Sequence, residues 1–365
     1  MQVKSILVAI CLILIGNSTA LPQIATIPAG TIEVLKGKRI YVGKTLAADA
    51  QTLVLLQQDG RLKLLPKDES SFGKQVSTKF TPFSTETIRQ KLLDEFGSNY
   101  RVSITSHYVV VHPPGSHHLW AQPFEELYSR FEQYFMVRGI AVATPQFPLV
   151  AVVLNTRQEF DLFLERYQQE LASPNVVGYY SPLSNRMITY NQASGGPSSK
   201  VSIFTQDTIV HEATHQAAFN TQIHSRFTPT PRWFSEGLAT MFEARGVNNS
   251  PAFPNFADRI NRSQLNALLK FMEPGVSQGV IVSLVQDDEL FRADPQRAYA
   301  YSWGLAFFLA ETRPLEFAAF INKTSSRTSF GSYSANQRIE DFIRTIGMDL
   351  DDLEIRLSRF VQKMN

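Results

Sequence analysis

The sequence predicts an α+β protein, in which a small N-terminal β module precedes a larger domain that is mixed α/β at first and helical towards the C-terminus. Short apolar runs alternate with turn residues between residues 31 and 65, which is typical of small β domains. From Tyr100 strand and helix periodicities are mixed, and from Thr205 the pattern is almost wholly helical. The 365 residues leave room for one large domain and one small one. With 44% hydrophobic and 19% charged residues, the composition is that of a globular chain.

The first twenty residues, 1–20, have the pattern of a signal peptide. Lys4 supplies a positive start, residues 5–15 an apolar stretch, and Ser18-Thr19-Ala20 a small-residue cleavage site. The apolar stretch is short for a bilayer, so we expect cleavage before Leu21 and no stable membrane span in the mature chain. The protein is then exported to the periplasm, the cell envelope or the medium. The only cysteine, Cys11, lies in this segment, so a metal in the mature chain needs histidine or carboxylate ligands.

Residues 21–72 form the predicted β module. Two apolar runs at residues 52–56 and 61–65 flank Asp59-Gly60, which is a strong hairpin signal. The module is small enough for an SH3-like arrangement, and its sequence assigns it no function. Residues 73–99 are expected to be a linker to the domain that spans residues 100–365.

The larger domain opens with alternating strands and helices. Thr156 and Glu159 form a capping box, the signature of a helix start. The other expected elements are a strand at 102–111, a helix through Phe124, Leu127, Tyr128, Phe131 and Phe135, a buried strand at 148–154, and a hairpin of 176–180 with 186–190 that turns at Ser184-Asn185. The aromatic stripes indicate a core and not a binding surface.

The helical part contains one motif with a strong chemical meaning, His211-Glu212-Ala213-Thr214-His215. On a helix, two histidines four positions apart stack on one face and can bind the same metal ion. Glu212 lies about 100° further round the helix, beside the metal, where it can accept a proton from a bound water. Chance alone gives such a pattern in a chain of this kind with odds on the order of one in a hundred, so it needs support from its surroundings.

A second helix supplies the third expected ligand, Glu236. Thr230 is a candidate N-cap, Pro231 suits the first helical position, and Gly246 is a candidate stop. Most helical glutamates are ordinary surface residues, but Glu236 lies in an apolar stretch, where a carboxylate is costly unless something pairs with it. Catalytic zinc sites use three protein ligands and one open position, so we expect one zinc ion on the two histidines and Glu236.

These motifs resemble those of the gluzincin metallopeptidases, the class that contains thermolysin and the aminopeptidases of the leukotriene-hydrolase type. The resemblance rests on His211-Glu212-x-x-His215 followed by Trp233-Phe234-Ser235-Glu236-Gly237-Leu238-Ala239. The chain is more closely similar to a bacterial family of exported, peptidase-like proteins. That likeness extends from about Tyr100 to the C-terminus and includes Tyr179-Tyr180-Ser181-Pro182, Asn185-Arg186 and Tyr301-Ser302-Trp303-Gly304.

The resemblance implies a zinc peptidase and gives roles to further residues. In gluzincins a tyrosine on a later helix donates a hydrogen bond to the tetrahedral intermediate, and Tyr301 is the matching residue, with Tyr299 as its substitute. A core aromatic on a helix at residues 299–311 is an equally good explanation of Tyr301. The exopeptidase members carry a Gly-x-Met-Glu-Asn strand that this chain lacks, which favours an endopeptidase. Thr240 stands where thermolysin-like enzymes have an aspartate that orients a zinc histidine.

We therefore expect an exported zinc endopeptidase that acts on peptides or proteins, with Glu212 as general base. The net charge of +2 and the lack of a basic run give no indication of nucleic acid binding. The alternative is a non-catalytic binding protein of the cell envelope that keeps the gluzincin-like fold. Because a structural metal site needs no base, Glu212 favours the enzyme.

Five other residues have side chains that could bind a metal or a substrate. His117-His118 follow a Pro-Pro-Gly loop, but adjacent histidines rarely share one metal ion. His224 and Arg226 lie between the two site helices, either within reach of a substrate or, more simply, in an exposed loop. Glu243, seven positions after Glu236, either backs the site or is a surface charge.

Overall fold

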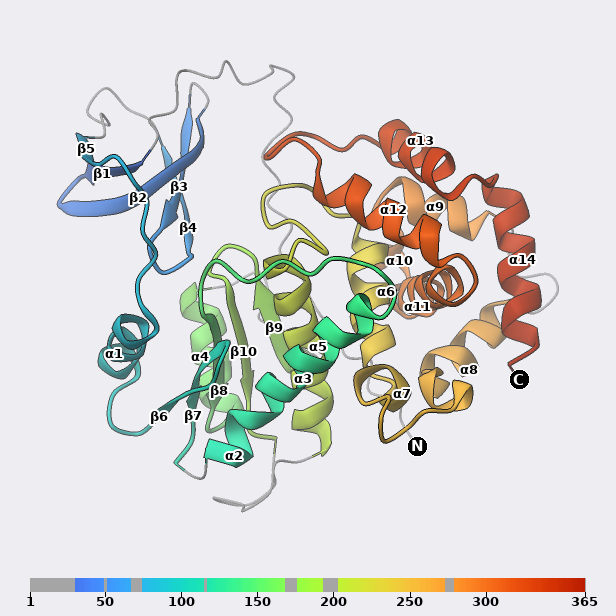
Figure 1. The fold of residues 1–365 in the computed structure, drawn as a ribbon, viewed down its shortest axis with the longest axis horizontal. Coiled ribbons are helices and arrows are strands. Elements are labelled where there is room, and N and C mark those ends of the chain that lie inside the picture. The colour runs from blue at the N-terminus through green and yellow to red at the C-terminus, as the bar shows by residue number, and fades with distance from the viewer. Residues whose placement is uncertain are drawn as a thin grey trace.

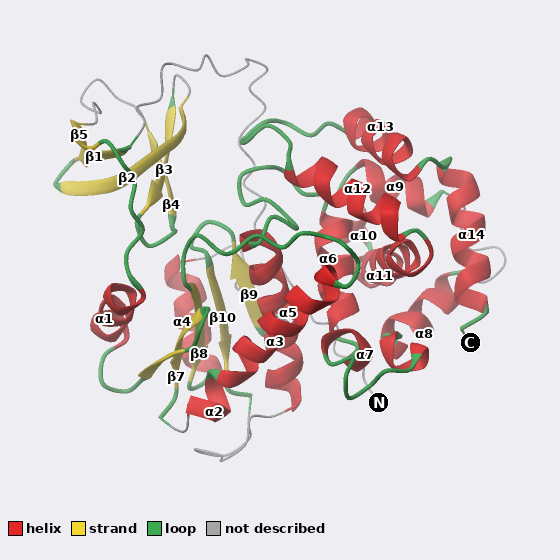
Figure 2. Cartoon of the chain, viewed as in Figure 1, coloured by secondary structure: helices red, strands yellow, loops and turns green. Residues whose placement is uncertain are grey.

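The computed structural model describes residues 30–48, 51–66, 74–114, 117–167, 176–192, 203–272 and 279–364, and it confirms the α+β class (Figure 1, Figure 2). Two five-stranded sheets are followed by a C-terminal part built from helices. The expected signal peptide, residues 1–20, lies outside the described residues. No helix in the described ranges has the length and hydrophobicity that a bilayer crossing requires.

The first sheet forms the β module. Its strands are β1 (Thr31–Lys36), β2 (Arg39–Ala48), β3 (Thr52–Gln57), β4 (Leu62–Pro66) and β5 (Lys74–Ser77). The pairing is antiparallel throughout, in the order β4-β3-β2-β1-β5. The predicted hairpin is confirmed, because Asp59-Gly60 lies between β3 and β4 and Gly60 has a positive φ of 84°. A register shift between Thr45 and Ala47 adds a bulge to β2, which bends a strand.

Residues 73–99 were expected to be a linker, and the described part of this segment, residues 74–99, is structured. β5 pairs with β1 and so extends the module past its predicted end at residue 72. Helix α1 (Thr85–Phe96) follows, with the Ser84 side chain accepting a hydrogen bond from the backbone N–H of Thr87. Ile88 and Leu92 are buried in the core beneath the second sheet. Only these two positions of the helix are deeply buried, so its sequence is polar enough to resemble a linker.

The second sheet lies at the start of the larger domain. Its strands are β6 (Arg101–Ile104), β7 (Tyr108–His112), β8 (Leu149–Leu154), β9 (Gly178–Ser181) and β10 (Arg186–Tyr190). The strand order is β6-β7-β8-β10-β9, and the central strand β8 is parallel to both of its neighbours, β7 and β10. Strand β8 is wholly buried, as the sequence predicted. The β9–β10 hairpin is also confirmed. The single strand expected at 102–111 is wrong, because Thr105 accepts a hydrogen bond from Tyr108 N–H across a turn that separates β6 from β7.

Helices cover both faces of the second sheet. Helices α3 (Gln122–Met136) and α5 (Ile203–Asn220) pack on one face, while α1 and α4 (Arg157–Tyr167) pack on the other. The predicted aromatic stripe is buried in α3, and α4 begins at the predicted capping box of Thr156 and Glu159. His117 and His118 fall in the short helix α2 (His117–Trp120), and their side chains lie outside the described part of the chain.

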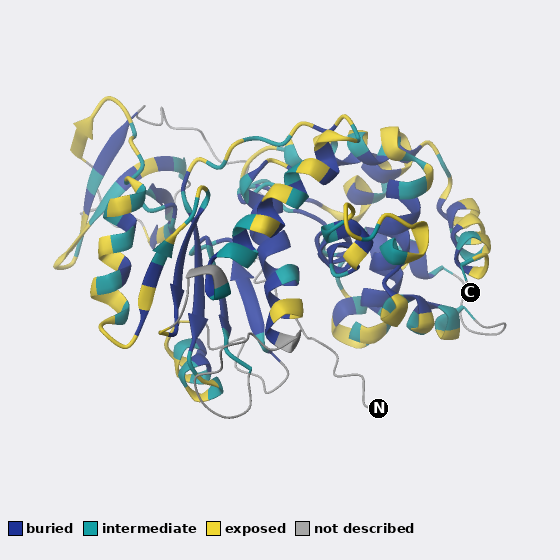
Figure 3. Ribbon diagram, turned by 60° about the horizontal axis from the view of Figure 1, so that its bottom comes forward, coloured by how far each residue is buried: buried dark blue, intermediate teal, exposed yellow. Residues whose placement is uncertain are grey.

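The C-terminal part is helical, as predicted. Its elements are α6 (Arg232–Phe242), α7 (Arg245–Asn248), the 3-10 helix η2 (Phe256–Arg259), α8 (Arg262–Phe271), α9 (Val280–Gln286), α10 (Leu290–Ala293), α11 (Pro295–Thr312), α12 (Pro314–Ser325), α13 (Ala335–Ile346) and α14 (Leu350–Gln362). Helix α11 lies at the centre, with residues 298–310 all buried (Figure 3).

Two glycines set the position of α11. A Cβ atom at Gly237 of α6 would overlap the backbone carbonyl oxygen of Ser302, and one at Gly304 would overlap the side chain of Leu268 on α8. Because the obstacle at Gly237 is rigid backbone, only glycine there lets α11 approach α6 this closely, whereas the end of the Leu268 side chain at Gly304 can move. This close packing decides which face of α11 is turned towards α6.

Candidate metal centre

The two histidines of the H-E-x-x-H motif lie on one face of α5, as predicted. Their Nε2 atoms are 3.2 Å apart, and both side chains are almost fully buried. Helix α5 contacts β9 and β10 on one side and α3 and α6 on others. The histidines are therefore held between the second sheet and the helical part (Figure 1).

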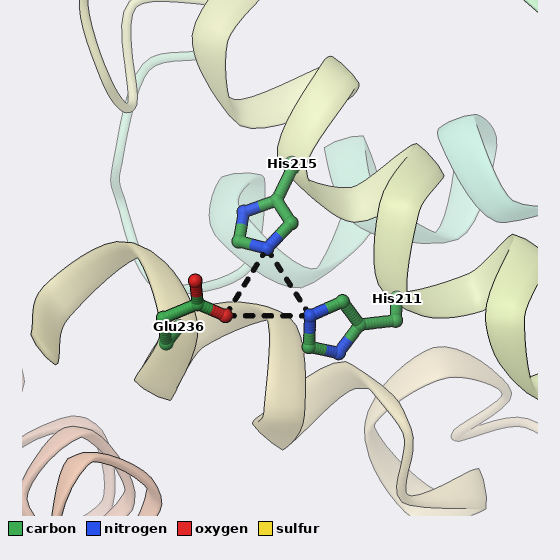
Figure 4. A group of neighbouring side chains, drawn as sticks. All are labelled: His211, His215 and Glu236. Carbon is green, nitrogen blue, oxygen red and sulfur yellow. Dashed lines mark hydrogen bonds and ion pairs between the residues drawn. The ribbon is translucent and has the colours of Figure 1, made fainter. Parts of the chain in front are cut away.

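Glu236 of α6 completes the group. Its Oε2 atom lies 3.5 Å from Nε2 of His211 and 3.5 Å from Nε2 of His215, and the side chain is completely buried. Figure 4 shows these three atoms facing one another. The structure thus brings together the three residues that the sequence analysis selected as ligands.

The spacing of the three atoms suits a small metal cation. In a tetrahedral site with bonds of about 2.1 Å, neighbouring ligand atoms lie about 3.4 Å apart. The separations of 3.2, 3.5 and 3.5 Å agree with that value and leave a point about 2.0 Å from all three atoms. This buried group could therefore hold a metal ion.

The negative charge of Glu236 is balanced by its neighbours. Burial alone would raise the pKa of this carboxyl, but His211, His215 and the guanidinium of Arg232 hold that pKa well below its usual range. Arg232 lies one turn earlier on α6, with Nε 3.6 Å from Oε1 of Glu236. Burial lowers the pKa of His215, which favours the neutral imidazole that metal binding requires. Glu236 is therefore ionised and positioned beside a neutral ligand.

A second carboxylate, Glu243, orients His211. Its Oε1 atom lies 2.7 Å from Nδ1 of His211, and its Oε2 atom accepts a hydrogen bond from Asn261 at 2.8 Å. An imidazole that donates from Nδ1 presents the lone pair of Nε2 to a metal. Burial would lower the pKa of His211, but Glu236 and Glu243 hold it well above its usual value. A bound cation would replace the proton that His211 then carries.

Thr240 does not orient a histidine. Its hydroxyl donates to the backbone oxygen of Glu236 at 2.6 Å, a bond that helical threonines often make to the carbonyl four residues earlier. The orienting carboxylate is Glu243, seven positions after Glu236, and two helical turns return it to the same side. That spacing is the sequence signal for it, and of the two explanations of Glu243 the structure supports the one in which it backs the site.

Glu212 lies next to the group on α5. It is completely buried and makes no ion pair among the described residues, and the hydrogen-bonding group nearest to its carboxylate there is the backbone N–H of Tyr180 on β9. Burial raises the pKa of Glu212 to about 8, with the charge of Glu236 adding to this effect and His211 opposing it. The structure thus separates a charge-paired carboxylate, Glu236, from an unpaired one beside it.

The edge strand β9 passes close to Glu212. A Cβ atom at Gly178 would lie 2.5 Å from Cγ2 of Thr208 and 3.4 Å from Cγ of Glu212. A glycine within a strand commonly marks such a close approach. The free edge of the sheet therefore runs beside the candidate base.

A polar network fixes the β9–β10 hairpin to α5. The Tyr180 hydroxyl donates to Oδ1 of Asn185 at 2.8 Å, and Asn220 of α5 donates to the same atom at 2.8 Å. Asn185 has a positive φ of 55°, which asparagine tolerates better than most residues. These contacts give a structural reason for the Tyr180 and Asn185 positions of the sequence motif.

Tyr299, and not Tyr301, is turned towards the group. Burial raises the pKa of the Tyr299 hydroxyl well above its usual value, the charge of Glu236 adds to this, and the hydroxyl interacts with Arg232. Tyr299 also shares the side of α11 on which Ser302 contacts α6. Tyr301, about 200° further round the helix, lies near Arg297 and Glu354 instead. Of the two candidate tyrosines, the structure thus brings Tyr299 to the group and leaves Tyr301 away from it.

Helix α6 is capped by a distant residue and not by Thr230. The helix begins at Arg232, whose backbone N–H donates to Oδ1 of Asp288 at 3.2 Å, and it ends at Phe242, before Gly246. Asp288 is held in turn by Arg338, 2.9 Å away. Because Asp288 lies 56 positions after Arg232, no local pattern could have indicated this cap.

His224 and Arg226 are buried and not in an exposed loop. Arg226 donates to the backbone oxygens of Gly60 and Pro182, at 2.7 Å each, and so joins the β module to the β9–β10 turn. His224 packs between two phenylalanine rings, and burial lowers its pKa to about 3, so the imidazole is neutral. Both residues stabilise the surroundings of the site.

Residues 205–331 match a family described as a protein of unknown function, DUF1570. The matched segment begins inside α5 and ends beyond α12, so it contains the whole metal group together with Glu212 and Tyr299. The β module and all strands of the second sheet lie outside it. No curated protein matches the chain in a sequence comparison.

Proposed function

We propose that the protein is an exported, zinc-dependent peptidase, and that it acts as an endopeptidase. The observation that supports this most is the buried three-residue group with a separate carboxylate, Glu212, beside it. A structural metal site has no need of such a base, whereas hydrolysis by an activated water does.

Zinc suits the donor set of His211, His215 and Glu236, because two imidazoles and one carboxylate are common ligands of catalytic zinc. When bound, zinc would lower the pKa of a water molecule and polarise a peptide carbonyl. Glu243 and Asn261 keep His211 in the orientation that ligation requires.

The other residues of the site then have distinct tasks. Glu212 accepts the proton of the attacking water and passes it to the leaving amine. The hydroxyl of Tyr299, kept protonated by its raised pKa, donates a hydrogen bond to the oxyanion. The edge strand β9 lies beside Glu212, where an extended peptide could add to the sheet.

The test combines metal analysis with a cleavage assay on the chain that begins at Leu21. We expect about one zinc per chain and cleavage of casein or of members of a peptide library. Glu212→Gln is nearly isosteric and is not a ligand, so it should keep the zinc and lose turnover by about a hundredfold or more. Glu340→Gln, on an exposed position of α13, is the matched control and should change neither.

Two outcomes would contradict the proposal. One is a wild-type chain with full zinc that cleaves no peptide of the library. The other is a Glu212→Gln variant that cleaves as fast as wild type at equal zinc content. The first result would favour the non-catalytic binding protein of the cell envelope, and the second would show that Glu212 is not the general base.

A further inference from the structure

The β module carries a positive charge that the rest of the chain does not share. Residues 30–79 contain nine Lys and Arg against five Asp and Glu, a net charge of +4, whereas the whole chain has +2. One of the five acidic residues, Asp59, is paired with Arg61 at the turn that contacts the second domain. Such an asymmetry indicates an acidic partner for the module.

The outer end of the β1–β2 hairpin adds exposed apolar side chains to this charge. Leu35 and Ile40 are 55% and 59% exposed, and they stand directly opposite each other in the antiparallel pair. Directly opposed residues lie on the same face of a sheet, so the two side chains form one apolar spot. The hairpin projects away from the helical part (Figure 1), and its outer end is exposed (Figure 3).

Basic side chains surround this spot. Lys38 and Arg39 lie at the turn of the hairpin and are exposed. Lys44 is exposed on the same face of β2, four residues beyond Ile40, and Lys74 of β5 reaches that face through its register with β1. This face therefore carries four cations around the apolar pair and one half-buried acid, Glu33, which stands opposite Lys74.

We propose that this hairpin tip, composed of Leu35, Lys38, Arg39, Ile40, Lys44 and Lys74, docks on a membrane surface rich in anionic lipid. The two apolar side chains enter the headgroup region, and the four cations lie at the level of the lipid phosphates. A nucleic acid or a purely acidic polymer would engage the cations but would leave the apolar pair in water. The site helices are not part of the tip, so this inference is independent of the peptidase proposal.

Sedimentation with lipid vesicles tests the proposal. The chain that begins at Leu21 is used, so that residues 1–20 contribute nothing to binding. We expect it to pellet with phosphatidylcholine vesicles that contain phosphatidylglycerol, to bind pure phosphatidylcholine weakly, and to lose binding as salt is added. The variants Leu35→Ser/Ile40→Ser and Lys38→Glu/Arg39→Glu should each weaken binding by about tenfold or more.

Two matched double variants on the helical part serve as controls. Leu315→Ser/Ile355→Ser removes two apolar side chains that are 81% and 51% exposed, and Lys270→Glu/Arg356→Glu reverses two exposed charges. Both should bind the anionic vesicles as wild type does. Because every substituted residue is exposed, the thermal unfolding of all four variants should match wild type.

Several results would overturn the proposal. They are equal binding to both vesicle types, no binding to either, and tip variants that bind as well as wild type. Tight binding to soluble poly-glutamate that is unaffected by Leu35→Ser/Ile40→Ser would assign the tip to an acidic macromolecule instead.

Discussion

The two sides of the candidate metal centre differ in how their charges are paired. On the α6 side, Glu236 faces two imidazoles with Arg232 one turn away, and its pKa is held well below the usual range. On the α5 side, Glu212 is equally buried but makes no ion pair among the described residues, and burial raises its pKa to about 8. Neighbouring carboxyl groups thus have opposite preferences for a proton.

This difference shows that the surroundings, and not the residue type, decide whether a buried carboxyl group keeps its proton. A carboxylate paired with cationic and imidazole groups stays ionised and is suited to hold a metal. A carboxyl group without such partners exchanges protons near neutral pH, which is the property of a general base. The comparison can be tested by changing each side of the site in turn.

The largest effect is expected from removing the paired carboxylate. Glu236→Gln should lose most of its zinc and all measurable turnover, because two remaining ligands hold zinc weakly. Glu212→Gln should keep its zinc under the same conditions. The zinc content of both variants is measured by mass spectrometry after dialysis. Equal zinc in the two variants would contradict the prediction that Glu236 holds the metal and Glu212 does not.

The next effect concerns the two tyrosines of α11. Tyr299→Phe should reduce kcat by about a hundredfold, the size seen when one oxyanion donor is lost. Tyr301→Phe removes the same hydroxyl from another side of the helix and should leave kcat within about twofold of wild type. Steady-state kinetics at equal zinc content decide the matter, and the reverse order of effects would restore Tyr301 as the donor.

A smaller effect is expected from the residue behind His211. Glu243→Gln should weaken zinc affinity by roughly tenfold to a hundredfold, because the imidazole loses a charged partner that fixes its orientation. Competition with a chelator measures the affinity. Glu340→Gln, at an exposed position of α13, is again the control, and an unchanged affinity in Glu243→Gln would show that the contact does not support the metal.

The smallest effect is expected at two glycines that allow close contacts near the site, Gly237 on α6 and Gly178 on β9. Gly237→Ala should lower the free energy of unfolding by about 1–3 kcal/mol, because its Cβ would meet the rigid backbone oxygen of Ser302. Gly178→Ala should cost less, because its nearest obstacle is the end of the Thr208 side chain. Urea unfolding measures the free energy of unfolding of both variants. A larger loss in Gly178→Ala than in Gly237→Ala would contradict this prediction.

The sequence by itself determined the residues that form the metal group. A four-residue separation puts His211 and His215 on one helical face whatever the rest of the fold does, and the motif fixes Glu212 beside them. Glu236 was found because a carboxylate among apolar residues needs a partner. The α+β class and most strands and helices also followed from periodicity, which depends only on residues a few positions apart.

Tertiary packing decided which side chains from separate elements meet. Tyr299 and Tyr301 are equivalent in the local pattern, and only the contact of Gly237 with α11 turns Tyr299 towards the group. The N-terminus of α6 is capped by Asp288, which is distant in sequence. The segment expected to be a linker contains β5 and α1, because β5 pairs with β1 and α1 packs on the second sheet. Periodicity gives the face of an element but not the neighbour that covers it, because that neighbour is chosen by close packing across the whole chain.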